Sequence, residues 1–199
     1  MSDSRLATTA LLLLPGALTV YLSFNAGGFF PNTVAFVALL VAGVLILRIG
    51  ASEAPFAGLG RGVLVAAGAL ALFAGWTLLS ATWSDSTARA LIEFDRALLY
   101  LLVLLLFGSL AREPSNLQWL VRGMAVGIVI VATIALITRI LPETWPIGAD
   151  LAQNRLSYPL TYWNALGLLA GLGIVFCAYL TTSLQEPRLV RVLAAAPAA

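Results

Sequence analysis

One stretch of this sequence combines the side chains that a binding site at a membrane surface would need. It runs from Arg155 to Gly167, reads Arg-Leu-Ser-Tyr-Pro-Leu-Thr-Tyr-Trp-Asn-Ala-Leu-Gly, and passes from a polar segment into a long apolar run. Its arginine can donate two parallel hydrogen bonds to a phosphate, and Asn164 places an amide just inside the apolar run. The same residue types also occur at an ordinary membrane boundary, where aromatic rings form a belt and arginines contact lipid headgroups.

A second segment carries four charged side chains at helical spacing. Separations of four, four and three residues place them on one side of a helix, as a single stripe of alternating sign. We predict a helix over residues 86 to 110 here, with Ser84 or Asp85 as its cap. In one interpretation the stripe is solvated and its ion pairs are weak; in the other, its two arginines bind an anionic lipid-linked substrate. The four residues are Asp85, Arg89, Glu93 and Arg96.

The composition identifies the solvent around these segments. Of the 199 residues, 61% are hydrophobic and 10% are charged, and the mean hydropathy is +0.98. We therefore predict an all-α, polytopic membrane helix bundle, because backbone groups in lipid must be hydrogen bonded within their own segment. Six complete transmembrane helices and a truncated seventh are expected, in a single transmembrane domain over residues 1–199. The predicted spans are 6–24, 29–47, 62–80, 97–111, 118–138 and 163–182.

Arginine placement predicts the orientation, because all 11 basic residues are arginine. With the N-terminus in the cytoplasm, seven arginines are inside and four outside, which satisfies the positive-inside rule. The inner residues are Arg5, Arg48, Arg61, Arg112, Arg122, Arg188 and Arg191, and the outer residues are Arg89, Arg96, Arg139 and Arg155.

Several kinds of site are not expected. The only cysteine, Cys177, excludes a disulfide within the chain, and without histidine or clustered carboxylates we predict no metal site. We expect no cofactor and no nucleic-acid partner, since the net charge is only +2 and no phosphate-binding glycine loop is present. The glycines at 27–28 and 58–62 are interpreted as flexible turns. Catalytic residues are not assigned.

The stretch from Arg155 to Gly167 resembles the start of the core shared by the O-antigen ligase and O-antigen polymerase family. Trp83-Ser-Asp-Ser, Ala88-Arg-Ala and Arg96-Ala-Leu-Leu-Tyr are similar to an earlier extracytoplasmic segment of its bacterial members. The resemblance implies a glycosyltransferase of the bacterial cytoplasmic membrane that moves a glycan from an undecaprenyl diphosphate carrier to an acceptor sugar outside. It implies that the partners are a lipid-linked oligosaccharide, an acceptor glycan or glycolipid, and membrane lipids. The implied substrate-binding candidates are Arg155 first, then Arg89, Arg96 and Asn164.

The sequence departs from this family in two respects. Family members have more spans, and they place a large outer loop with a functional Arg and His further along, whereas this chain has no histidine. We therefore expect the N-terminal portion of a longer protein, inactive alone, whose general base lies outside this sequence. Ligase and polymerase chemistry, the glycan and the oligomeric state are left open.

Two other classes of function fit the same residues. In a transporter or lipid flippase, Pro159, Asn164 and the outer arginines would line a translocation path. In a non-catalytic membrane scaffold, small residues would let helices of two proteins approach closely. The small residues in question are Gly167, Gly171 and Ala178.

Overall fold

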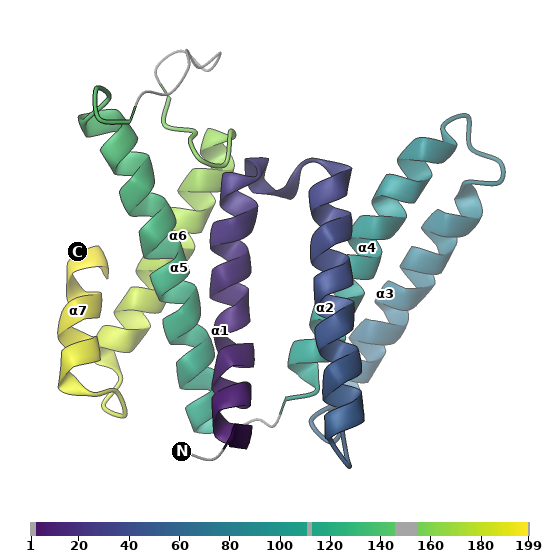
Figure 1. The fold of residues 1–199 in the computed structure, drawn as a ribbon, viewed down its shortest axis with the longest axis horizontal. Coiled ribbons are helices and arrows are strands. Elements are labelled where there is room, and N and C mark those ends of the chain that lie inside the picture. Colours follow the sequence, from purple (N-terminus) through teal and green to yellow (C-terminus); the bar gives the residue numbers. More distant parts are fainter. Residues whose placement is uncertain (1–2, 111–112, 146–154, 199) are drawn as a thin grey trace. The chain divides into compact units, whose positions relative to one another are not determined.

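The computed structural model describes residues 3–110, 113–145 and 155–198, and in these ranges all regular secondary structure is helical (Figure 1). The predicted all-α class is confirmed. Helices α2 and α5 both begin at a proline, which suits the first helical position because its missing N–H would have no partner there. The elements are α1 (Asp3–Phe24), η1 (Ala26–Gly28), α2 (Pro31–Ala51), α3 (Arg61–Ser80), α4 (Thr87–Gly108), α5 (Pro114–Ile140), α6 (Trp163–Thr182) and α7 (Arg188–Ala198).

Five of the described helices, α1, α2, α3, α5 and α6, are long and apolar enough to cross a membrane. Helix α4 has 22 residues, but its charges lie in its first half. Its apolar part, Ala97–Gly108, is only about 18 Å long, against a hydrocarbon core of about 30 Å. Helix α7 has 11 residues and occupies the position of the predicted truncated span. The chain is therefore a multi-pass helical membrane protein.

The helices form two compact units. Unit 1 comprises Met1–Gly28 and Glu113–Ala199, and unit 2 comprises Phe29–Arg112. The expectation of a single transmembrane domain stays a prediction, and the two units are described separately below.

Helices α1 and α5 of unit 1 cross at glycine. A Cβ atom built on Gly127 would lie 2.6 Å from the Gly16 carbonyl oxygen, and one on Gly123 would lie 3.0 Å from the Leu13 side chain. The absence of side chains therefore brings the two backbones into direct contact. In lipid, the hydrophobic effect does not drive helices together. The van der Waals and weak hydrogen-bond contacts at this close approach therefore contribute to the association of α1 with α5.

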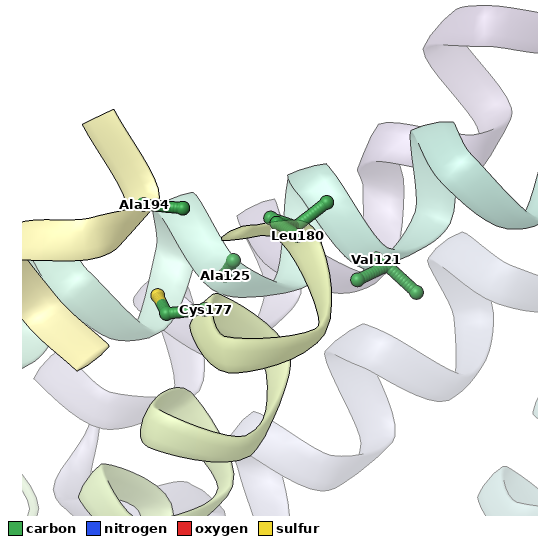
Figure 2. Close-up of a cluster of buried hydrophobic side chains, with 5 residues drawn as sticks. All are labelled: Val121, Ala125, Cys177, Leu180 and Ala194. Carbon is green, nitrogen blue, oxygen red and sulfur yellow. The ribbon is translucent and has the colours of Figure 1, made fainter. Parts of the chain in front are cut away.

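Apolar side chains join α5, α6 and α7 within unit 1. Figure 2 shows this cluster, to which all three helices contribute side chains. A second cluster joins α5, the start of α6 and the segment before α6. The first cluster contains Val121, Ala125, Cys177, Leu180 and Ala194, and the second contains Val131, Ala135, Leu160 and Leu166.

In unit 2, α4 packs against both α2 and α3. Arg48 of α2 holds the C-terminal end of α4, because its Nε donates to Ser109 Oγ and its Nη2 donates to the Ser109 carbonyl, both at 3.0 Å. A cation is favourable there, where helix carbonyls lack partners. A Cβ on Gly58 would lie 2.5 Å from the same Ser109 oxygen. Gly58 lies in a turn, as predicted, and its missing side chain also permits a tight contact with the end of α4.

Each unit separates the predicted inner and outer arginines. In unit 2, contacts of Arg48 and Gly58 with Ser109 bring the end of α2, the start of α3 and the end of α4 together. Within each unit this division agrees with the predicted topology, and the orientation in the membrane stays a prediction. Arg112 and the side chain of Arg5 lie outside the described residues. Unit 1 has Arg122, Arg188 and Arg191 at one end and Arg139 and Arg155 at the other; unit 2 has Arg48 and Arg61 opposite Arg89 and Arg96.

Candidate substrate-binding site at the start of α6

The segment that precedes α6 is fixed by burial. Leu160 is 9% exposed and packs with Val131 and Ala135 of α5. The Thr161 N–H donates to the Ser157 carbonyl at 2.8 Å and closes a turn. Leu160 therefore anchors this part of the segment to α5. Residues 146–154 of the predicted outer loop lie outside the described part of the chain.

The end of α1 supports the same segment through a left-handed turn. Ala26, Gly27 and Gly28 have φ angles of 53°, 66° and 75°. A Cβ on Gly27 would lie 3.7 Å from the Leu160 carbonyl oxygen. The two glycines lie in a short left-handed connection, and its flexibility stays a prediction. Gly27 and Gly28 adopt positive φ angles without the steric cost that a side chain brings.

Arg155 lies over the ring of Trp163, with 4.5 Å between its Cζ atom and the ring centroid. This is a cation–π contact, in which the electron-rich ring face attracts the guanidinium. The ring contacts the face of the guanidinium and accepts no individual N–H group. The N–H donors of Arg155 therefore stay available to an anion such as phosphate. Arg155 is exposed, and within the described ranges it forms no ion pair with a carboxylate.

Asn164 has a local partner. It is the second residue of α6, its side chain is exposed, and its Nδ2 donates to the Tyr162 hydroxyl at 2.8 Å. The amide therefore has its partner in the residue before the helix, two positions away. The Tyr162 and Trp163 rings lie 5.4 Å apart. Contacts thus run continuously through four residues, called here the Arg155 cluster: Arg155, Trp163, Tyr162 and Asn164.

A second aromatic group stands next to the cluster in sequence. The ring of Tyr158 lies 6.0 Å from that of Phe24 in an edge-to-face arrangement and 6.3 Å from that of Trp145. Three segments of unit 1 therefore bring rings together at the end that carries Arg155. Tyrosine and tryptophan favour the level of lipid headgroups, so this group is suited to keep the cluster at the membrane surface.

The predicted charged stripe is only partly formed in unit 2. Helix α4 begins at Thr87, so Asp85 lies outside the helix. Arg96 Nη1 pairs with Glu93 Oε1 at 2.7 Å, and its Nη2 donates to the Phe29 carbonyl at 3.3 Å. Arg89 is exposed. Arg96 therefore forms a partly exposed ion pair, which fits both interpretations of the stripe.

The expected cap of this helix is wrong. The capping position is Ser86, whose side chain makes no capping hydrogen bond. Ser84 Oγ instead accepts from the Ser86 N–H at 3.2 Å, which forms a local turn before the helix. Arg89 and Arg96 belong to unit 2 and the Arg155 cluster to unit 1, so binding of one substrate by all four candidates stays a prediction.

Unit 1 also contains a buried ion pair that was not predicted from the sequence. Arg122 Nε donates to Glu186 Oε2 at 2.8 Å, and the Arg122 guanidinium lies 4.9 Å from the Trp119 ring centroid. The Glu186 side chain is 0% exposed, and its Oε1 has no hydrogen-bond partner among the described residues. A signal was available, because Arg122 falls inside the predicted span 118–138 and an arginine within a span needs a partner.

The candidate residues do not form a metal centre. Within the described residues, no three His, Cys, Asp or Glu side chains are grouped so that they could hold a metal ion. When the chain is compared with known proteins, no family profile matches it, and neither a curated protein nor a solved structure is significantly similar.

Proposed function

We propose that this chain provides the lipid-diphosphate site of a bacterial inner-membrane glycosyltransferase similar to the O-antigen ligases and polymerases. The observation that carries the proposal is the position of Arg155, exposed and stacked on Trp163 at the start of a membrane-spanning helix. A diphosphate at the membrane surface presents oxygens that a guanidinium binds in pairs. The turn from Ser157 to Thr161, which buried Leu160 anchors to α5, lies between that arginine and α6.

In this proposal the chain acts on the leaving group. An acceptor hydroxyl attacks the anomeric carbon of the glycan, the bond from that carbon to the diphosphate oxygen breaks, and the electron pair leaves with the diphosphate. Arg155 stabilises the negative charge that develops there. Asn164 and Tyr162 offer polar groups to sugar hydroxyls. The base that takes the acceptor proton is not among the residues proposed here.

The proposal is tested in the full-length protein by replacing Arg155 with Ala. We expect kcat for glycan transfer from an undecaprenyl diphosphate donor to fall by about 10²- to 10³-fold, the range found when one charge-stabilising donor is removed. Arg139→Ala is the matched control, because Arg139 is exposed at the same end of unit 1. Equal transfer by wild type and Arg155→Ala, at equal membrane levels, would remove Arg155 from the mechanism.

A second candidate function is a membrane scaffold, and an open face of α6 favours it. Cβ atoms built on Gly167 and Gly171 meet nothing within 4 Å in the described structure. Glycines four residues apart let a helix of another protein approach closely. Gly171→Leu would then abolish partner capture, while replacing Arg155, Arg139, Arg89 and Arg96 together would leave it intact. The opposite pattern would reject the scaffold.

A further inference from the structure

Unit 1 contains an apolar groove that the proposed glycan site does not use. It has a volume of about 610 Å³, within the range of ligand pockets, and is lined by α1, α5, α6 and α7. Four residues of the Figure 2 cluster form part of its wall: Ala125, Cys177, Leu180 and Ala194. The only charged side chain in its lining is Arg122.

The position of the groove determines what can fill it. Three of its four helices, α1, α5 and α6, are long and apolar enough to span a membrane. Its α5 wall runs from Trp119 to Ile130, so the groove extends from near the start of that helix to its middle. At such depths the surrounding solvent is hydrocarbon. Water would leave an apolar wall of this kind, and a lipid chain would contact it.

Positive charge collects at one end of the groove. Arg122 lines that end, and its pairing with Glu186 brings the start of α7 beside it. Helix α7 contributes Arg188 and Arg191, and Arg191 Nε donates to the Thr181 carbonyl at 3.1 Å. Of these three arginines, Arg122 lines the groove, and Arg188 and Arg191 lie outside the lining. Among the described residues at this end, the three arginines stand against two carboxylates, Glu186 and Glu113, which leaves an excess of one positive charge. An anionic headgroup is therefore favoured over a zwitterionic one.

We propose that this groove binds one acyl chain of an anionic phospholipid, whose phosphate lies against Arg188 and Arg191 beside the Arg122–Glu186 pair. Trp119, beneath the Arg122 guanidinium, suits the same interfacial level. The site lies at the opposite end of α5 and α6 from the Arg155 cluster. It is therefore independent of the proposed glycan transfer, and either proposal can fail without the other.

Native mass spectrometry of the full chain, released from detergent micelles, tests the proposal with added phosphatidylglycerol or phosphatidylcholine. Wild type should retain one phosphatidylglycerol, with at least tenfold preference over phosphatidylcholine. Arg188→Gln with Arg191→Gln should weaken phosphatidylglycerol binding by roughly 25-fold, about fivefold for each arginine. Arg139→Gln, which replaces an exposed arginine at the opposite end of α5 that belongs to neither proposed site, should leave it unchanged. Equal retention of both lipids, or loss of binding on Arg139→Gln alone, would overturn the proposal.

The acyl-chain part of the proposal has its own variants. Val126 lines the groove and is 59% exposed, so Val126→Trp should fill the groove and abolish binding of both lipids. Val175, which is 61% exposed and outside the lining, provides the control Val175→Trp. If Val126→Trp fails to fold, Leu193→Trp replaces it, with Leu189→Trp as its control. Leu193 is 66% exposed and lines the groove, whereas Leu189 is 69% exposed and lies outside the lining. Undiminished phosphatidylglycerol binding to a folded groove-filled variant would overturn the site.

Discussion

Arg122 and Glu186 are joined across unit 1 by a 2.8 Å hydrogen bond from Nε to Oε2, which ties α5 to the turn between α6 and α7. The side chains are 18% and 0% exposed, so both charges are largely removed from water. The attraction within a buried pair is offset by the cost of desolvating it, but either charge left alone keeps the cost without the attraction. The pair therefore makes the position of α7 depend on α5.

The first prediction concerns this dependence. Arg122→Met leaves a buried carboxylate without its cation, and we expect the free energy of unfolding to fall by about 3–5 kcal/mol. Adding Glu186→Leu should restore most of that loss, because an apolar pair of similar volume carries no desolvation cost. Chemical unfolding in detergent micelles of wild type, both single variants and the double variant completes the cycle. Additive losses in the double variant would mean that the two charges do not interact.

A second prediction concerns the contact between α1 and α5. Gly127→Ala places a Cβ 2.6 Å from the Gly16 carbonyl oxygen, which forces the two helix backbones apart. We expect a loss of about 1–3 kcal/mol of unfolding free energy, the usual cost of overpacking. Gly171→Ala is the control, because a Cβ there meets nothing within 4 Å and alanine is the better helix former. Equal stability of wild type and Gly127→Ala would show that the crossing tolerates a wider spacing.

The sequence predicted the helices well because their signal is local. Apolar runs give five spans whose bounds lie within a few residues of the predicted ones, and α6 occupies the predicted 163–182. Helix α4 (Thr87–Gly108) agrees with the helix predicted over residues 86 to 110, including its charged first half. The predicted complete span 97–111 has no counterpart among the five described helices that are long and apolar enough to cross a membrane, because its apolar run is short.

Pairings between distant residues could not be predicted in the same way. Glu186 stands 64 positions from Arg122, and nothing in either local sequence selects the other. The contact between Gly16 and Gly127 could not be predicted either. Each glycine matters because it leaves room for the backbone of the other. Within the candidate site, the four residues of the Arg155 cluster lie close together in sequence, so their grouping could be predicted. The approach of Gly27 to the Leu160 carbonyl oxygen joins two segments far apart in sequence, so it could not be predicted from either one alone.

A third prediction concerns backbone strain before α6. Thr161 has a φ angle of 68°, and a left-handed conformation costs an L-residue roughly 1–2 kcal/mol. Thr161→Gly removes that cost but adds about 0.5–1 kcal/mol of unfolded-state entropy, so we expect a net gain of about 0.5–1 kcal/mol. Thermal unfolding in detergent should show a raised midpoint. Thr144→Gly is the control, because Thr144 lies in a turn without a positive φ angle, and it should give no gain.

The last prediction separates binding from positioning in the Arg155 cluster, and it rests on the proposed glycan transfer. Trp163→Leu removes the ring face under the Arg155 guanidinium, and we expect kcat/KM to fall roughly two- to fivefold, as for an exposed cation–π contact. Trp163→Phe should retain part of the activity because its ring keeps an attractive face. Trp83→Leu, at an exposed tryptophan of unit 2, controls for loss of a surface ring.

The combination with Arg155→Ala decides the role of Trp163. If the ring acts only by holding the arginine, Trp163→Leu should reduce transfer no further once Arg155 is absent, because the group that it positions has gone. Steady-state transfer by the two single variants and the double variant measures this coupling. A double variant whose loss is the product of the single losses would show that Trp163 contacts the substrate by itself, for example by stacking on a sugar ring.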